Sequence, residues 1–456
     1  MPFIAVDPAT GTELRRFQGH DREDARAAAD AAARAQKAWA RTGFEDRAAV
    51  LRAAADILEA EADRWGRLMT EEMGKPLSEG RSEAEKCAWA LRYYADHGAD
   101  FLADRRVEVE GARAGWVYRP LGVVLAIMPW NFPFWQVFRA AAPTLMAGNG
   151  VLLKHASNVP GCARAVEEIF LRAGLPGGLF QNLFLEHEDL EVLLDHDAVQ
   201  AVTLTGSVRA GKAIAQQAGA RLKKCVLELG GSDPYVVLED ADLELALDRC
   251  VTSRLINTGQ SCIAAKRFIV VDEVHDAFRA GLLARFDELK QGPPLEEGVD
   301  LGPMAREDLR DTLHDQVTRS VEAGATLERG GEIPDRPGAW YPPTVLTGVT
   351  REMPAFREEL FGPVAVLIRA SDADEALELA NDTVFGLGAA VFTGDADRGE
   401  AIARDTLQAG ACFVNEFVRS DPRLPFGGIR ESGYGRELSP LGIREFVNVK
   451  TVWVAD

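Results

Sequence analysis

Short apolar runs alternate with stretches of helical character from about residue 121 onward. The runs cover residues 121–130, 150–154, 179–184, 198–206 and 223–231. Strands of a parallel sheet give near-continuous apolar runs because both of their faces are buried. Strands that alternate with helices are typical of a doubly wound α/β sheet. The pattern therefore predicts an open, mostly parallel α/β domain in this part of the chain.

A second series of strands and helices begins near residue 234. Its predicted strands are 234–240, 267–272, 364–370 and 389–394, and its predicted helices are 242–256, 274–290 and 373–381. A chain of 456 residues is also too long for one hydrophobic core. The repeated pattern and the length together predict a second α/β domain.

The ends of the chain carry different patterns. Residues 21–41 and 46–70 predict helices, the first of them begun by Asp21, whose side chain can accept from the free N–H groups of a first turn. Residues 107–122 alternate and turn at Gly111, which predicts a hairpin, and residues 444–454 alternate like a lone strand. Such strands have unpaired edges that must be covered. A partner subunit is the expected cover, so we predict a homodimer or homotetramer.

Charge and cysteine content narrow the class of protein. The 51 basic and 71 acidic residues give a net charge of −20, which disfavours nucleic acid as a partner but leaves room for a local positive pocket. The six cysteines show neither a C-x-x-C pair nor zinc-like spacing, and no histidine cluster predicts a metal site. No signal-like N-terminus and no membrane-length apolar run occur. We therefore expect a reduced cytoplasmic protein without disulfides.

Cys262 lies in the segment NTGQSCIAAKR, residues 257–267, after a predicted helix. A lone cysteine is most often an inert part of the core. Here a Gly-Gln-Ser turn precedes it, and the free N–H groups of such a turn can lower the pKa of a thiol or hold an oxyanion. Cys262 is therefore a candidate nucleophile.

Two further polar residues follow apolar strands. Glu228, in LELGG, is either a carboxylate facing water or a general base at the carboxyl end of a strand, where open α/β sheets bind ligands. Asn131, in PWNFP, is either an ordinary loop residue or an amide held rigidly enough to donate to an oxyanion. The sequence offers a nucleophile, a base and an oxyanion donor.

A cofactor cradle is predicted at residues 205–211, TGSVRAG. Gly206 and Ser207 occupy a strand-to-helix junction and Gly211 follows one turn later. The N-terminus of a helix offers free N–H groups and a partial positive charge to a pyrophosphate. Lys154 ends a neighbouring strand, from which it could reach ribose hydroxyls.

Seven segments in order resemble the signatures of the aldehyde dehydrogenase superfamily. They are PWNFP, LLKHAS, TGS with its later glycine, LELGG, GQSC, EELFGP and PFGGIRESGYGRE, which span about residues 128–437. The longer strings LLKHASNVPGCA and SDPRLPFGGIRESGYGREL are most similar to the succinate-semialdehyde dehydrogenase branch.

The resemblance implies a fold and a set of domains. It implies an α/β fold with a Rossmann-like cofactor domain, an α/β catalytic domain and a β oligomerisation arm. We assign residues 1–106 and 123–230 to the cofactor domain, 231–439 to the catalytic domain, and 107–122 with 440–456 to the arm.

The resemblance also implies roles for residues and an NAD(P)-dependent oxidation of an aldehyde. Cys262 would form a thiohemiacetal and then a thioester, Glu228 would activate water, and Asn131 would hold the oxyanion with the Cys262 N–H. Cofactor contacts are expected at Trp130, Lys154, Ser157, Gly206, Ser207, Gly211, Leu229, Glu359 and Phe361. No metal is implied.

Two features of the sequence predict the cofactor and the substrate. Many relatives have Lys-Pro-Ala-Glu where this chain has Lys154-His155-Ala156-Ser157. Ser157 removes an acidic group that would repel a 2′-phosphate, so we predict that NADP is preferred and NAD is also used. Arg139, on the helix after Asn131, is either a surface arginine or a cation for the far carboxylate of succinate semialdehyde, with Ser420 as a second donor.

Four alternatives remain: an aldehyde dehydrogenase of other or broad specificity, a thiol hydrolase, a non-catalytic homologue and a CoA-acylating enzyme. A thiol hydrolase needs a histidine beside its cysteine, and none is close to Cys262 in sequence. A non-catalytic homologue would be expected to lose the thiol or the carboxylate. A CoA-acylating enzyme would tend to lack Glu228. A panel of aldehydes with both cofactors separates these classes.

Overall fold

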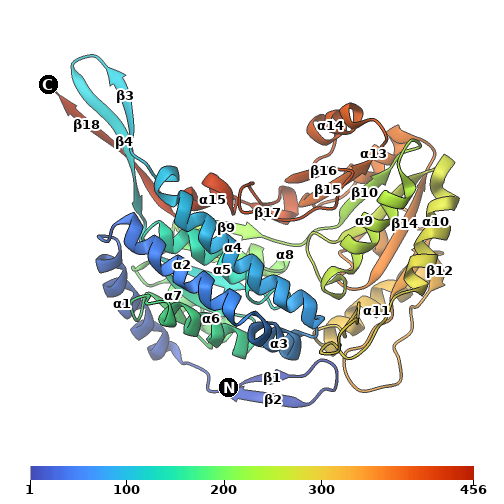
Figure 1. The fold of residues 1–456 in the computed structure, drawn as a ribbon, viewed down its shortest axis with the longest axis horizontal. Coiled ribbons are helices and arrows are strands. Elements are labelled where there is room, and N and C mark those ends of the chain that lie inside the picture. Colours follow the sequence, from blue (N-terminus) through green and yellow to red (C-terminus); the bar gives the residue numbers. More distant parts are fainter. Residues whose placement is uncertain (1, 456) are drawn as a thin grey trace.

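The computed structural model describes residues 2–455, which form two sheet-based lobes and a projecting arm (Figure 1). The sheet of the first lobe has the order β17-β9-β8-β5-β6-β7. All of its strands are parallel except β17. The strands are β5 (Val123–Met128), β6 (Gly150–His155), β7 (Phe180–Asn182), β8 (Val199–Thr205), β9 (Lys224–Glu228) and β17 (Gly433–Tyr434). The doubly wound sheet predicted from the apolar runs is confirmed.

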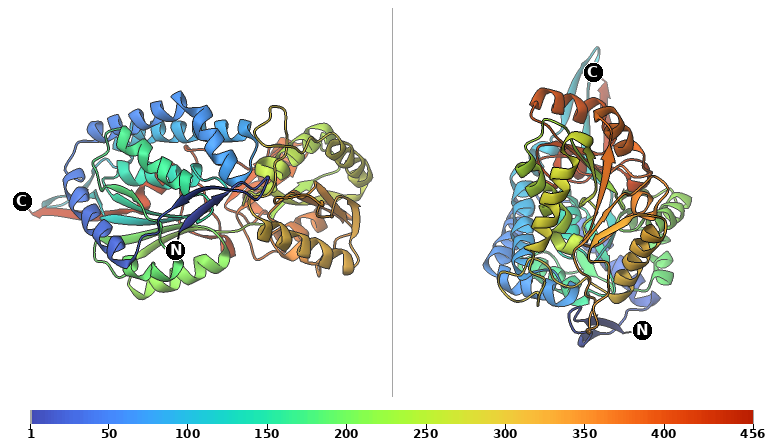
Figure 2. Two further views of the ribbon diagram at one scale, coloured as in Figure 1. Left: turned by 90° about the horizontal axis from the view of Figure 1, so that it is seen from below. Right: turned by 90° about the vertical axis from the view of Figure 1, so that its right-hand side faces the viewer.

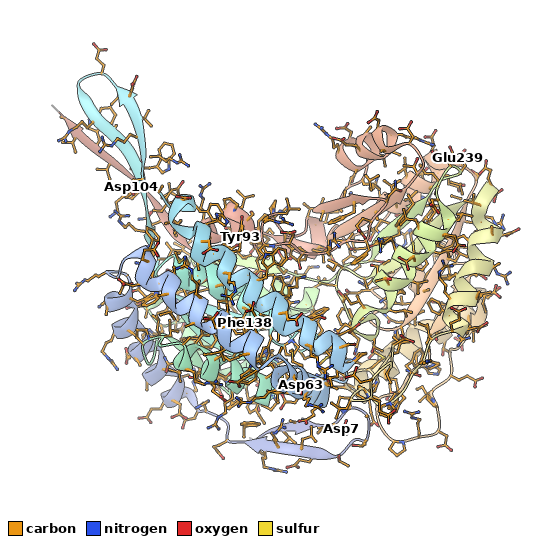
Figure 3. The ribbon with its side chains drawn as sticks, viewed as in Figure 1. Asp7, Asp63, Tyr93, Asp104, Phe138 and Glu239 are labelled. Atoms are coloured by element: carbon orange, nitrogen blue, oxygen red, sulfur yellow. The ribbon has the colours of Figure 1, made fainter. Side chains whose placement is uncertain are left out.

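Helices cover both faces of this sheet. They are α1 (Arg22–Trp39), α2 (Phe44–Ala60), α3 (Ala62–Met73), α4 (Leu77–Phe101), α5 (Trp135–Met146), α6 (Pro160–Arg172), α7 (Glu191–Leu194) and α8 (Val208–Ala220). Asp21 caps α1 as expected, because its side chain accepts from the N–H groups of Glu23 and Asp24. The core of the lobe is built largely of α2–α6 side chains; Phe138 is fully buried within it (Figure 3).

The prediction of one helix at 46–70 is wrong, because two helices occupy this stretch. The chain breaks into α2 and α3 at Glu61, whose φ of −117° and ψ of 25° interrupt the helical path. The long helix α4 was not predicted at all. Its buried residues include Leu77, Leu91 and Tyr94 beside alanine, glycine and Glu83, and the helix packs against α2, α3 and α5.

The second lobe contains a seven-stranded sheet of order β12-β13-β14-β11-β10-β15-β16, parallel except for β12. Its strands are β10 (Asp233–Val237), β11 (Ala265–Val271), β12 (Thr326–Arg329), β13 (Thr344–Thr347), β14 (Val364–Ala370), β15 (Gly388–Phe392) and β16 (Ala411–Val414). Its principal helices are α9 (Leu243–Leu255), α10 (Asp272–Asp287), α11 (Glu307–Glu322), α13 (Ala373–Asn381) and α14 (Ala396–Asp405), with the short helix α12 (Pro354–Arg357). The short helix α15 (Ser439–Glu445) packs against α4 and α5 of the first lobe. The predicted second α/β series is confirmed.

The arm is a three-stranded antiparallel sheet of order β18-β4-β3. β3 (Arg105–Val109) and β4 (Ala112–Pro120) form the predicted hairpin, with Gly111 at a φ of 70°. The strand predicted as solitary, β18 (Val447–Ala455), is not solitary, because it pairs with β4 along its whole length. Residues far apart in sequence thus complete one sheet, which local patterning does not reveal.

An N-terminal hairpin, β1 (Phe3–Val6) and β2 (Glu13–Phe17), lies at the junction of the two lobes (Figure 2). The carbonyl groups of Pro8 and Ala9 in its turn accept from Ala339 N and Trp340 Nε1 of the second lobe, at 2.8 and 2.9 Å. None of the helices within residues 2–455 is long and apolar enough to cross a membrane.

Candidate active site

The segment that leads to Cys262 has an unusual backbone. Asn257, Thr258 and Gly259 all have left-handed φ values, of 59°, 54° and 73°. A non-glycine residue in this region costs about 1–3 kcal/mol unless its surroundings hold it there. A Cβ on Gly259 would lie 2.4 Å from the carbonyl oxygen of Gly362, so glycine is required at that position.

Three contacts hold this segment in place. Both carboxylate oxygens of Glu79 accept from the backbone N–H of Asn257, at 3.1 and 2.9 Å. Arg254 Nη2 donates to the carbonyl of Gly259 at 2.5 Å. The Asn257 side chain donates to the carbonyl groups of Asn131 and Gln260, at 2.7 and 3.0 Å. The left-handed turn is thereby tied to the loop that carries Asn131.

Asn131 lies in the turn between β5 and α5 and is buried. Its Nδ2 donates to the carbonyl of Gln260 at 3.0 Å, which leaves the second N–H of the amide free of that bond. The turn is fixed from outside by Glu83 of α4, whose Oε1 accepts from the N–H groups of Phe134 and Trp135, each at 2.8 Å. The amide of Asn131 is therefore rigidly placed beside the nucleophile loop.

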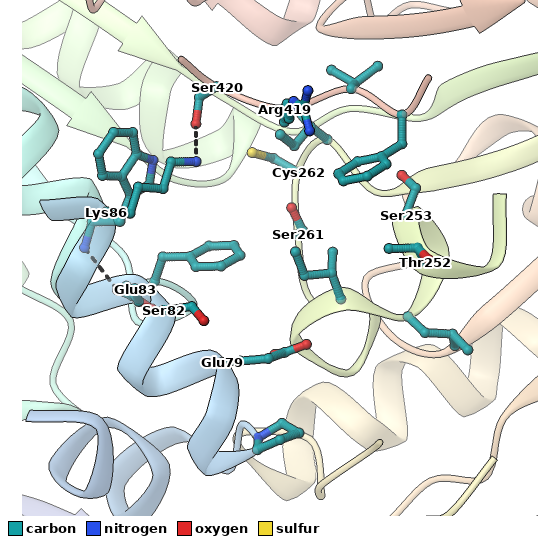
Figure 4. A pocket seen from close by; sticks show the side chains of 18 of the residues that line it. Glu79, Ser82, Glu83, Lys86, Thr252, Ser253, Ser261, Cys262, Arg419 and Ser420 are labelled. Atoms are coloured by element: carbon teal, nitrogen blue, oxygen red, sulfur yellow. Dashed lines mark hydrogen bonds between the residues drawn. The ribbon is translucent and has the colours of Figure 1, made fainter. Parts of the chain in front are cut away.

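Cys262 opens on a cavity of about 570 Å³ between α4, α5, α9 and the loop 417–420 (Figure 4). Most of its walls are apolar, and they include Phe132, Trp135 and Phe426. Burial raises the pKa of the Cys262 thiol to about 12, although Arg139 and Lys266 act in the opposite direction. Of the two roles that the sequence left open for the Gly-Gln-Ser turn, a lowered thiol pKa is not found, because the loss of hydration outweighs the nearby donors. The other role, to hold an oxyanion, stays a prediction.

Glu228 is the last residue of β9 and is almost fully buried. Neither carboxylate oxygen has a hydrogen-bond partner among residues 2–455. Burial raises the pKa of Glu228 well above its ordinary value, and the neighbouring Glu437 raises it further, while Arg139 and Arg436 lower it. Burial of Glu228 therefore favours its protonated form over the carboxylate.

Arg139 lies in the wall of the cavity, on α5 as expected. Its guanidinium forms an ion pair with Glu437, donates to Thr205 Oγ1 at 3.3 Å and lies 4.7 Å from the ring centroid of Phe426. Thr203 Oγ1 donates to the same Glu437 carboxylate at 3.3 Å. The positive charge of Arg139 is thus already balanced inside the protein.

The predicted pyrophosphate cradle has the expected local form. Ser207 caps α8, because its Oγ accepts from the N–H of Ala210 at 3.2 Å. A Cβ on Gly211 would lie 2.5 Å from the Leu229 side chain, so this glycine permits the close packing of α8 on the strand end. A Cβ on Gly206 would meet only Leu204, at 3.6 Å, which leaves space at the start of the helix.

Other predicted cofactor contacts lie between the lobes. Glu359 accepts from the N–H of Gly231 at 3.0 Å and lies 3.6 Å from Lys266 Nζ. The Trp130 and Phe361 rings pack edge to face, with centroids 5.8 Å apart. Residues from both lobes therefore meet beside Cys262.

Two further predicted cofactor contacts, Lys154 and Ser157, lie at or just beyond the end of β6. Lys154 Nζ is 3.4 Å from His187 Nε2, and burial lowers the pKa of Lys154 to about 8. Ser157 is exposed a short distance beyond the strand. Of these three residues the sequence analysis missed His187, since a single histidine in a loop carries no pattern.

Four polar residues around the cavity were not predicted from the sequence: Glu79, Glu83, Lys86 and Glu437. Three of them lie on α4, which the hydrophobic pattern did not predict. Ser420, which was predicted, accepts a hydrogen bond from Lys86 Nζ at 2.9 Å (Figure 4). No group of acidic, histidine and cysteine side chains suited to a metal ion occurs within residues 2–455.

Residues 2–452 match the aldehyde dehydrogenase family, and the chain belongs to that family. It is 48% identical to the probable succinate-semialdehyde dehydrogenase [NADP(+)] of Synechocystis over 455 residues, the full length of both chains. It is also 48% identical to the succinate semialdehyde dehydrogenase [NAD(P)+] of Escherichia coli K12, which covers 99% of this chain and 97% of that one.

Solved structures show the same fold. The succinic semialdehyde dehydrogenase of Streptococcus pyogenes in complex with NADP+ superimposes with a TM-score of 0.97 at 37% identity, over 100% of both chains. The family and the α/β fold expected from the sequence motifs are confirmed.

Proposed function

We propose that this chain is an NADP-preferring dehydrogenase that oxidises succinate semialdehyde to succinate through a thioester on Cys262. The observation that carries the proposal is the arrangement around one cavity. The Cys262 thiol opens into this cavity, Asn131 is held next to the loop that carries it, and the buried Glu228 is close enough to affect its pKa. Lys86 and Ser420 form a polar end of the same cavity. Full-length relatives that carry this substrate in their names support the assignment.

The chemistry assigns one task to each group. The Cys262 thiol releases its proton to water, and its sulfur then bonds to the aldehyde carbon as the carbonyl π bond opens. The oxyanion that forms accepts from the free N–H of Asn131 and the N–H of Cys262. A nicotinamide held beside Glu359 and Phe361 would supply the hydride acceptor that the oxidation of the thiohemiacetal to a thioester requires. Glu228, once deprotonated, removes a proton from a water molecule that attacks the thioester, and the bond to sulfur then breaks to release the acid.

The preference for NADP rests on the end of β6. The residues there fit a 2′-phosphate in chemical type, because Lys154 and His187 supply nitrogen donors and Ser157 supplies an exposed hydroxyl. The relatives named for NADP(+) and NAD(P)+ support this choice. NAD lacks the phosphate and is expected to be the poorer cofactor.

We further propose a homodimer or homotetramer that resides in the cytoplasm. The arm supports the first point, because β18 has a free edge and exposes Trp453, Val449 and other apolar side chains. The six cysteines support the second, because all of them are free thiols.

The test is a spectrophotometric panel at about 340 nm, where reduced nicotinamide absorbs. Succinate semialdehyde, butanal and a bulkier aromatic aldehyde are each assayed with NADP and with NAD, and Cys262→Ala is the control. Succinate semialdehyde with NADP should give the highest kcat/KM and the variant none. A higher kcat/KM for uncharged aldehydes would refute the substrate, and cofactor-independent ester cleavage without any dehydrogenation would instead favour a thiol hydrolase.

A further inference from the structure

Lys86 projects from α4 into the cavity that contains Cys262 (Figure 4). Its ammonium donates to Ser420 Oγ at 2.9 Å and lies 4.5 Å from the centroid of the Trp135 ring. Within residues 2–455 no carboxylate lies within ion-pair distance of this ammonium. Burial lowers the pKa of Lys86 to about 8, which is the expected consequence of holding an ammonium in such surroundings.

The two other cations that line the cavity are already engaged by acidic groups. Arg139 is paired with the buried Glu437. Arg419 lies 3.8 Å from Glu416, and 58% of its side chain is exposed to solvent. Lys86 is only partly exposed, and the described residues offer it no ion-pair partner, so an anionic group of a ligand would gain more from Lys86 than from either arginine.

The rest of the cavity suits a short chain that ends in such a group. Phe132, Trp135 and Phe426 provide apolar walls, and Cys262 and Lys86 both open into the same space. A four-carbon aldehyde with a terminal carboxylate has the same division into a reacting end, an apolar middle and a charged end.

We propose that Lys86, together with Ser420, binds the carboxylate of the substrate and is the residue that makes the enzyme select an anionic aldehyde. The inference rests on the proposed function and deepens it. It places a cation for the carboxylate on α4, in addition to the predicted Arg139, which is paired with Glu437 and lies near Glu228.

The test compares an anionic substrate with its neutral analogue. Succinate semialdehyde and its methyl ester, methyl 4-oxobutanoate, are assayed with saturating NADP on the full-length enzyme. Lys86→Met should lower kcat/KM for the acid by about 10- to 100-fold, mainly through KM, because one charge-assisted hydrogen bond is lost. The value for the ester should change by less than about threefold.

Three further variants separate recognition from a structural role. Lys86→Arg should retain most of the preference for the acid. Lys86→Gln, which can still donate to Ser420, should lose the preference like Lys86→Met, and it provides the same answer if the methionine variant does not fold. Arg423→Met removes an exposed charge that is paired with Asp421 outside the cavity lining, and it should leave the ratio unchanged.

The outcomes distinguish this inference from the proposed function. If the unmodified enzyme uses acid and ester equally well, the proposed substrate is wrong and the inference fails with it. If the enzyme prefers the acid and both neutral variants keep that preference, only the role of Lys86 is refuted. Equal losses for acid and ester in both variants would likewise show that Lys86 acts only in packing.

Discussion

At the scale of single residues, burial sets the protonation states of the site. It raises the pKa of both Cys262 and Glu228, and it lowers that of Lys86. These shifts favour the neutral forms of the thiol and the acid, and each must lose a proton during the reaction proposed for it. The proposed reaction therefore requires interactions that lower the pKa of Cys262 and of Glu228 again.

Replacement of the base separates the two halves of the reaction. Glu228→Gln removes the group that activates water but leaves the thiol and the oxyanion donors. Mixing with aldehyde and NADP in a stopped-flow instrument should give a burst of roughly one reduced cofactor per subunit, followed by slow turnover. Cys262→Ala should give no burst. Unchanged steady turnover in Glu228→Gln would contradict the assigned role.

The titration of Lys86 predicts a pH-dependent selectivity. Below its pKa of about 8 the ammonium is charged, and above it the charge is lost, so attraction for a carboxylate falls as pH rises. Four groups act on it: Arg139 from α5, Glu83 and Cys87 from α4, and Asp421 from the loop after Ser420. The ratio of kcat/KM for acid to that for ester should fall by about tenfold from pH 7 to pH 9.5.

The ratio is the informative quantity because Cys262 and Glu228 serve both substrates and their titrations cancel. A ratio that stays constant with pH would contradict the assignment. In Lys86→Arg the ratio should be independent of pH over the same range, since a guanidinium remains charged.

At the scale of elements, α4 organises the site although it supplies no reacting group. Glu79 holds the left-handed turn before Cys262, and Glu83 holds the turn that carries Asn131. Glu83 also forms a buried ion pair with Lys75, whose ammonium lies 4.3 Å from the ring centroid of Phe132. One helix thus fixes the relative position of the nucleophile and the oxyanion donor.

Loss of Glu83 should affect both stability and rate. Glu83→Ala leaves Lys75 buried without a partner and two N–H groups of α5 without an acceptor, so the free energy of unfolding should fall by about 3–5 kcal/mol. A lower kcat should accompany it because Asn131 is less firmly placed. Thermal unfolding and steady-state assays measure the two effects.

A double variant is the matched control. Lys75→Met with Glu83→Gln removes the buried charges together while the glutamine Oε1 can still accept from Phe134 and Trp135. It should be more stable than Glu83→Ala and recover most of kcat. If both proteins lose activity equally, the hydrogen bonds to the turn do not position Asn131.

At the scale of the whole molecule, the arm exposes apolar side chains and a strand edge that a monomer leaves uncovered. Its three strands project from the first lobe, and β18 combines a free edge with exposed apolar side chains (Figure 1). Exposed edges of this kind favour pairing with another chain. A second copy of the same protein is the cover we propose.

A charge on this strand should weaken the assembly. Trp453 is 59% exposed, and Trp453→Glu should shift the particle toward monomers in light scattering at micromolar concentration. Leu222→Glu is the control, because Leu222 is 96% exposed but lies between α8 and β9, away from the arm. Identical masses for Trp453→Glu and the unmodified protein would place the contact elsewhere.

The sequence by itself determined the family, the two α/β series and the hairpin at Gly111. These features are local in origin, since strand and helix periods, turn glycines and short motifs are written in consecutive residues. The motifs also identified Cys262, Glu228 and Asn131 as candidates before any geometry was known. Their catalytic roles remain predictions that the experiments above address.

Only the tertiary structure decided which groups face one another. It paired β18 with β4, balanced Arg139 with Glu437, raised the pKa of Cys262 by burial and brought Lys86 to Ser420 across 334 positions of sequence. Burial and ion pairing depend on contacts between segments that are distant in sequence. The candidate reacting residues could be identified from consecutive residues of the sequence. Their protonation and the ion pairs around them depend on tertiary packing.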